Sequence, residues 1–128
     1  MLVLLLAVVA LKSAIANERI LTHADAVLTR SALEAASKRQ WKTVRERENR
    51  VQNPIARKLI TWRRLTGAGA TPRFDEAERF LVENPGWPQH DRLMRRAEQA
   101  LPASWTAEQI VSWFGVHEPL SALGAVRL

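Results

Sequence analysis

Cysteine is absent from this sequence, and so is tyrosine. The lack of cysteine excludes disulfides, cysteine-bound zinc, a thiol nucleophile and an anchor on a lipid-modified cysteine. Glycine occurs only five times in 128 residues, and no apolar run reaches the ~20 residues that a membrane-spanning helix needs. The chain is rich in alanine, leucine, arginine and glutamate, a composition that favours helices over strands.

The N-terminus carries a ten-residue apolar run from Leu2 to Leu11, followed by Lys12. Such a run suits the apolar segment of a secretory signal, and Ala14 and Ala16 supply the small residues of a cleavage site. We therefore expect residues 1–16 to be a signal peptide, residues 17–128 to be the mature domain and the protein to be periplasmic. A buried first helix is the alternative, because no basic residue precedes the run.

The mature chain has the pattern of one helix after another, with apolar residues at helical spacing. Val27 belongs to such a stripe in the first helix, Val51 in the second and Ile55 in the third. Helices are expected at residues 23–39, 41–53, 54–66, 74–83, 88–101, 106–114 and from about 119 onward. Thr106 and Gln109 have the spacing of a capping box at the start of the sixth helix.

Prolines mark the boundaries between these helices. Those at positions 54, 72, 88, 102 and 119 follow one another at steps of 14 to 18 residues. Two such steps match the length of a helix–turn–helix repeat. Short connections make neighbouring helices antiparallel, and stacked hairpins form an α-solenoid. The predicted fold is thus all-α and TPR-like, with six to seven helices, although the TPR consensus is absent.

The last apolar stripe, begun by Leu120, Leu123 and Val126, has no following helix to cover it. Units of a solenoid bury their apolar faces against the next unit, so an end needs either a polar cap or a continuation. We therefore expect the domain to be truncated at its C-terminus.

Few residues suggest chemistry. His23, His90 and His117 lie far apart in sequence and lack the spacing of metal ligands. The acids Asp75, Glu76 and Glu78 could include a catalytic pair, but carboxylates in a first helical turn are favoured by the helix dipole alone. No catalytic residue, metal site or cofactor site is therefore expected.

Basic residues form three clusters, and five tryptophans accompany them. With stacked tryptophans such clusters could bind nucleic acid, but interleaved acids favour solvated helix faces instead. Trp41, Trp62 and Trp113 fall on apolar stripes and are expected in the core. Trp87 and Trp105 lie in predicted turns and are the candidate glycan contacts. The clusters are Arg45, Arg47 and Arg50; Arg57, Lys58, Arg63 and Arg64; and Arg92, Arg95 and Arg96.

Two segments resemble a known family. They are Glu83-Asn84-Pro85-Gly86-Trp87-Pro88, followed by Arg95-Arg96-Ala97-Glu98, and Pro54-Ile55-Ala56-Arg57-Lys58-Leu59-Ile60, followed by Trp62. Both resemble the N-terminal helical superhelix of soluble lytic murein transglycosylases, and Trp113-Phe114, Pro119-Leu120, Gly124 and Leu128 match the same region. The resemblance covers about Asp25 to Leu128.

The resemblance implies a scaffold for peptidoglycan glycan strands. In that family a C-terminal lysozyme-like domain cleaves the bond between MurNAc and GlcNAc, using a glutamate that is followed by serine. Neither Glu-Ser nor the family's Gly-Leu-Met-Gln element occurs here, so no catalytic residue carries over. The implied partners are glycan strands and that missing domain, with no nucleic acid, and the chain is expected to be a monomer.

Two other hypotheses remain open from the sequence. The chain could be a stand-alone periplasmic TPR-like adaptor that binds proteins. If the N-terminal run is retained, the net charge of +6 would also suit a cytosolic nucleic-acid binder.

Overall fold

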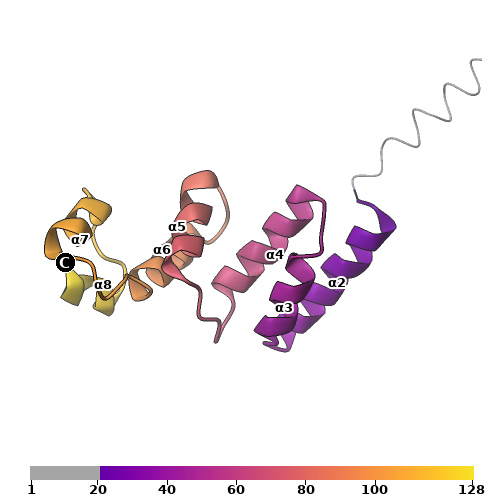
Figure 1. Cartoon of the computed structure of the whole chain (residues 1–128). Helices are drawn as coiled ribbons and strands as arrows, with labels where there is room; N and C mark the ends of the chain where they lie inside the picture. Colours follow the sequence, from indigo (N-terminus) through magenta and orange to yellow (C-terminus); the bar gives the residue numbers. More distant parts are fainter. Residues whose placement is uncertain (1–20) are drawn as a thin grey trace, which may run out of the picture.

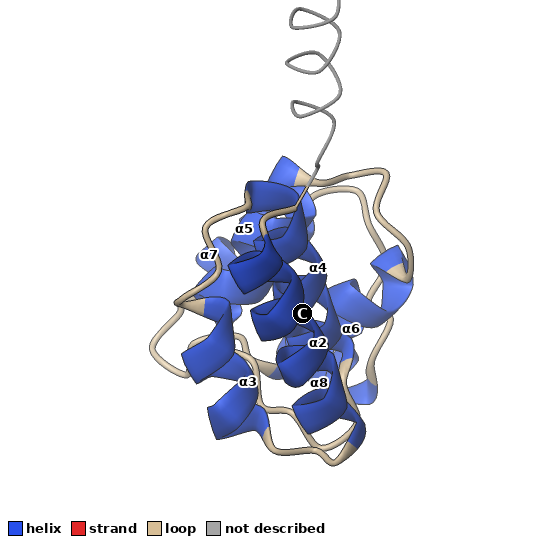
Figure 2. Ribbon diagram, turned by 90° about the vertical axis from the view of Figure 1, so that its right-hand side faces the viewer, coloured by secondary structure: helices blue, strands red, loops and turns tan. Residues whose placement is uncertain are grey.

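The computed structural model describes residues 21–128 and, within that range, contains seven α-helices and no strand (Figure 2). The all-helical prediction is therefore confirmed, whereas the predicted signal peptide lies outside the described residues. None of the helices in residues 21–128 combines the length and the apolar character needed to cross a membrane. The helices are α2 (His23–Ser37), α3 (Trp41–Glu48), α4 (Pro54–Thr66), α5 (Phe74–Glu83), α6 (His90–Gln99), α7 (Ala107–Phe114) and α8 (Ala122–Arg127).

The helices follow one another along an elongated row, from α2 to α7 and α8 (Figure 1). The most extensive helix contacts join α2 to α3 and α5 to α6, and in both cases only a short connection separates the partners. Helix α4 contacts α2 and α3 on one side and α5 and α6 on the other. It therefore links a three-helix unit, α2–α4, to the remaining helices.

Local capping sets most helix starts. The Thr22 side chain accepts a hydrogen bond from the backbone N–H of Asp25 at 3.1 Å, which satisfies one of the first amides of α2. Asn53 does the same for α4, where Pro54 occupies the first helical position. The capping box predicted for Thr106 is confirmed, because its side chain and that of Gln109 bond reciprocally to the backbone.

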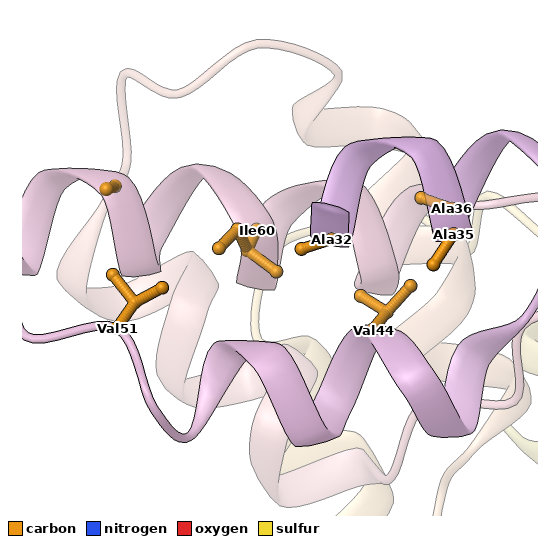
Figure 3. Close-up of a cluster of buried hydrophobic side chains, with 7 residues drawn as sticks. Ala32, Ala35, Ala36, Val44, Val51 and Ile60 are labelled. Atoms are coloured by element: carbon orange, nitrogen blue, oxygen red, sulfur yellow. The ribbon is translucent and has the colours of Figure 1, made fainter. Parts of the chain in front are cut away.

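The core of the three-helix unit is built of small residues. Figure 3 shows side chains from α2, α3 and α4 converging on one cluster. Alanines on α2 let the neighbouring helices come close, and valine and isoleucine fill the remaining space. The cluster consists of Ala32, Ala35, Ala36, Val44, Val51, Ala56 and Ile60.

The second half of the molecule has larger core residues. Leu65 at the end of α4 packs with Phe80 and Leu81 of α5 and with Leu93 and Ala97 of α6. A third, smaller cluster joins Leu101 to Ile110 and Phe114 of α7. Leu93 and Ala97 of α6 and Ile110 and Phe114 of α7 thus lie buried at the spacing of one helix face.

Three apolar stripe residues do not lie where the pattern predicted. Val27 is 49% exposed and Ile55 is 63% exposed, so each lies on the outer edge of its stripe. Val51 is buried, but it is not part of a helix because α3 ends at Glu48. The prediction of a helix through residue 53 was therefore wrong.

Asp25 explains why the chain leaves the helical path after α3. Its buried carboxylate accepts the backbone N–H groups of Gln52 at 2.8 Å and Asn53 at 3.1 Å. These amides bond across to α2 instead of continuing the helix, and this holds the connection against the three-helix unit. Similarly, α6 begins at His90 rather than Pro88 because Gln89 has a left-handed backbone, with φ of 60°.

Two glycines permit close approaches. A Cβ built on Gly67 would lie 2.0 Å from the indole ring of Trp41, so the ring packs directly on the glycine backbone. A Cβ on Gly124 would lie 2.5 Å from the carboxylate of Glu98. Glu98 is fully buried, and its Oε1 accepts the backbone N–H of Leu120 at 2.7 Å. Glycine at position 124 thus makes room for the carboxylate that attaches the segment before α8 to α6.

Candidate functional site

Trp87 lies in the connection between α5 and α6, as predicted, but its ring is half-buried against other residues. Its indole packs edge-on against Phe80 at 5.9 Å between ring centroids. The Nζ atom of Lys58 lies 5.4 Å from the Trp87 ring, within the range of a cation–π contact. Trp87 also lines an apolar hollow of about 220 Å³ with Ile55 and Leu59. The ring therefore has a packing role and also a surface on which a ligand could lie.

Trp105 lies in the connection between α6 and α7 and belongs to an aromatic cluster. Its ring meets that of Phe74 edge-on at 4.8 Å, and Phe74 meets Trp113 at 5.4 Å. Trp105 and Trp113 line an open hollow of about 440 Å³ together with Glu108, Gln109 and Ser112. Indole rings beside hydrogen-bonding side chains suit a sugar ring, which has apolar faces and a polar edge.

The distinction between core and turn tryptophans is smaller than predicted. All five are half-buried, and each packs against at least one of the three apolar clusters. Trp62 reaches across to the next hairpin, where its Nε1 donates to the carbonyl of Pro88 at 2.9 Å. The two candidate glycan contacts, Trp87 and Trp105, are assigned to different clusters, so the structure does not bring them together in one pocket.

A buried charge network joins the two halves of the molecule. Arg64 of α4 donates from Nε to Glu48 of α3 at 2.7 Å and from Nη2 to Glu76 of α5 at 3.3 Å. Arg45 of α3 adds a bidentate pair to Glu76, at 2.8 and 3.2 Å. Thr61 donates its hydroxyl to Glu48 at 2.6 Å. Three helices are therefore held together by two arginines and two glutamates.

This network fixes the charge of its members. Burial would raise the pKa of Glu76, but the hydrogen bond from Arg45 and the charge of Arg64 outweigh it and lower the pKa to about 2. Burial would likewise lower the pKa of Arg64, but the hydrogen bond and charge of Glu48 raise it above its ordinary value. Glu76 is thus ionised at neutral pH, which makes it unsuited to donate a proton as a catalytic acid.

Two of the three acids at the start of α5 form ion pairs in the structure. Asp75 and Glu76 lie in the first turn, as the dipole interpretation predicted. Asp75 pairs with Arg73 at the surface at 3.0 Å. The pairing of Glu76 with Arg45 and Arg64 was not predicted from the sequence, because those partners lie 31 and 12 residues earlier.

Several members of the basic clusters also have partners. Arg57 donates to the backbone carbonyl of Val51, Arg47 to the hydroxyl of Ser31, and Arg96 to the carbonyls of Gly67 and Ala70. Arg64 is buried, which the prediction of solvated basic faces had not foreseen.

Above the network lies a groove of about 500 Å³ between α4 and α5, which we call the charged groove. It is defined by Arg57, Lys58 and Arg64 of α4, Glu76, Arg79 and Glu83 of α5, and Glu48 of α3. No group of three or more histidine or acidic side chains within residues 21–128 has a geometry that could hold a metal ion.

Comparisons of the chain with protein-family models, with curated proteins and with solved structures found no match. The features of the structure that could bear on function are the two tryptophan surfaces and the charged groove.

Proposed function

We propose that this chain is the substrate-guiding helical scaffold of a peptidoglycan lytic transglycosylase and works in the periplasm. The cleavage chemistry then belongs to a lysozyme-like domain that residues 1–128 do not include. The scaffold offers glycan strands a row of helices with two tryptophan surfaces, at Trp87 and at Trp105.

The observation that carries the proposal is the contact between the segments behind the family resemblance. Trp62 of the first segment donates its Nε1–H to the carbonyl of Pro88 in the second. Farther along, the carboxylate of Glu98 lies 2.5 Å from the position that a Cβ on Gly124 would take, so two more of these residues are in contact. Residues that are distant in sequence thus form one framework, as expected if the pattern belongs to a fold rather than to chance composition.

Cosedimentation with purified sacculi tests this proposal. We expect the chain to pellet with intact peptidoglycan and to remain in solution without it. Replacing Trp105 with alanine should weaken retention, and Trp113→Ala, which alters the same hollow, should do so as well. Val116→Ala is the matched control because Val116 is exposed and lies in the connection after α7. A chain that stays wholly in the supernatant would overturn the proposal.

Two further observations test the export of the chain and its link to a catalytic domain. Mass spectrometry of the exported chain should show Asn17 as the first residue. Retention of residues 1–16 would instead favour the cytosolic nucleic-acid hypothesis. Coding DNA that continues past Leu128 into a domain with Glu-Ser and Gly-Leu-Met-Gln would support the enzyme assignment, and a stop codon there would oppose it.

A periplasmic protein-binding adaptor is the second candidate. It is favoured by one observation, the exposed apolar side chains near the C-terminal end, which include Val116, Leu120, Leu123 and Val126. Exposed apolar patches often mark contacts with other proteins. A chain that folds cooperatively, stays monomeric in sedimentation velocity and ignores sacculi would favour this adaptor over the scaffold.

A further inference from the structure

The charged groove is formed by two helical faces that are polar where helices usually pack with apolar residues. On α4 the lining positions are 54, 57, 58, 61 and 64, and on α5 they are 76, 79, 80 and 83. Both sets follow the spacing of one helix face. Figure 1 shows α5 as the next helix after α4 along the row. Because these opposing faces carry charged side chains, they do not form a close apolar contact, and a groove remains between them.

The charged side chains at the floor of the groove are all paired with one another. Arg64 pairs with Glu48 and Glu76, and Glu76 also pairs with Arg45. Two guanidinium groups and two carboxylates balance there, and their donors and acceptors are largely used by one another. A ligand would therefore be recognised by the walls of the groove rather than by its floor.

The walls carry unbalanced positive charge. Arg57 is exposed, and two of its nitrogens bond to the Val51 carbonyl, which holds the guanidinium in place and leaves Nη1 for another acceptor. Within residues 21–128, the Lys58 side chain has only the Trp87 ring as a partner, and the side chains of Arg79 and Glu83 form no hydrogen bond or ion pair. Three cations therefore face the groove against one carboxylate whose charge is not already paired.

We propose that the charged groove binds the carboxylate-bearing stem peptides of the glycan strand. This inference rests on the proposed function and names the part of the substrate that the groove contacts. Guanidinium groups bind carboxylates in a bidentate geometry, and the uncharged GlcNAc units of the strand offer no matching charge. A groove of about 500 Å³ is within the range of sites for small ligands. Glu83 provides an acceptor for an ammonium group on such a peptide.

Calorimetric titration of the purified chain with a stem tetrapeptide tests the assignment. The peptide with free carboxylates should bind, and the same peptide with its carboxylates amidated should bind at least tenfold more weakly. Binding should also weaken as salt rises from 50 to 300 mM, since exposed charges are screened. Equal binding of both peptides would overturn the proposal.

Single substitutions locate the site. Lys58→Gln and Arg79→Gln should each weaken binding about fivefold, the change expected from losing one partly exposed charge contact. Arg92→Gln is the matched control because Arg92 is an exposed cation of α6 outside the groove, and it should leave affinity within twofold. Equal losses in all three variants would mean that net charge alone attracts the peptide, and the groove assignment would then be wrong. Circular dichroism of each variant verifies that the helices are intact.

The sacculus experiment separates this inference from the function on which it rests. If the chain pellets with sacculi but the tetrapeptide does not bind, the groove assignment fails and the scaffold proposal stands. If neither binds, both fail. A single-stranded oligonucleotide that competes with the tetrapeptide and loses affinity in the same variants would point to nucleic acid and overturn the peptide assignment.

Discussion

The two halves of this molecule are held together by different interactions. In the unit α2–α4 the core is alanine, valine and isoleucine, and the helices lie close because their contact residues are small. From α5 to α8, large aromatic rings make most of the apolar contacts. Individual side-chain hydrogen bonds add to them: Glu98 accepts from the Leu120 amide, and the Arg127 guanidinium donates to the Pro102 carbonyl at 3.0 Å. The first arrangement follows from helical periodicity, whereas the second depends on long side chains that reach between segments.

Between the halves, an ionic junction accompanies the apolar contacts that Leu65 makes with α5 and α6. Removing Arg64 from this ionic junction should therefore have the largest effect on stability among the changes that we propose. We expect Arg64→Met to destabilise the chain by about 3–5 kcal/mol, because it leaves the buried Glu48 without its cation. Urea unfolding followed by circular dichroism measures this loss.

Two further variants test whether the loss of stability comes from the unpaired charge of Glu48. Arg63→Met is the control, since Arg63 is only half-buried and belongs to no ion pair of the described residues. The double variant Arg64→Met/Glu48→Leu should regain part of the lost stability, because no buried charge is then left unpaired. A single variant as stable as Arg63→Met would show that the junction contributes little.

The next largest effect is expected where the indole of Trp41 rests on Gly67. Gly67→Ala should cost about 2 kcal/mol, since the new Cβ would lie 2.0 Å from the Trp41 indole and the whole ring would have to shift. Gly86→Ala provides the comparison, because nothing lies within 4 Å of a Cβ there. Thermal unfolding of both variants measures the difference, and similar melting temperatures would contradict the close contact.

Acid should weaken the junction. The pKa of Glu76 is lowered from 4.5 to about 2, so its contribution to stability is complete above pH 4.5 and is lost as the pH falls toward 2. We expect that contribution to be about 1–2 kcal/mol, because Arg45 is partly exposed to solvent. Unfolding of the wild-type chain and of Glu76→Gln, measured from pH 6 to pH 2, should give a difference that narrows with acid. A constant difference would exclude the ionic role of Glu76.

The smallest effect is expected in the second half, at Gly124. Alanine there would bring a Cβ within 2.5 Å of the Glu98 carboxylate, and a cost of about 1 kcal/mol is expected because the short α8 can shift. Hydrogen exchange of the Leu120 amide, which bonds to Glu98, should speed up in this variant. Unchanged protection of that amide would show that Glu98 does not anchor the segment.

Much of the fold could be predicted from the sequence, for physical reasons. The start of α4 at Pro54 and that of α7 after Thr106 depend on local caps, and such caps can be recognised from residues a few positions apart in the sequence. The early end of α3 was not predictable in this way, because it depends on Asp25, which lies 27 residues before Gln52. Periodicity suggested that Val51 was buried, but it could not reveal that the residue lies outside the helix.

In the candidate site, too, local features could be predicted from the sequence and long-range contacts could not. Trp87 and Trp105 could be placed in turns from neighbouring prolines and caps, and the structure has them there. The pairing of Arg64 with Glu48 and Glu76, by contrast, joins three helices, and its charges look like ordinary solvated residues in sequence. The groove above this network follows only once the polar faces of α4 and α5 are known to oppose each other.

The proposed scaffold would hold peptidoglycan without cleaving it. The direct measurement incubates the purified chain with sacculi and analyses both pellet and supernatant by mass spectrometry. We expect the chain to be recovered in the pellet and the 1,6-anhydro-muropeptides in the supernatant to stay at the level of a protein-free blank. Release of anhydro-muropeptides above that blank would contradict it, since the active site would then lie within these residues.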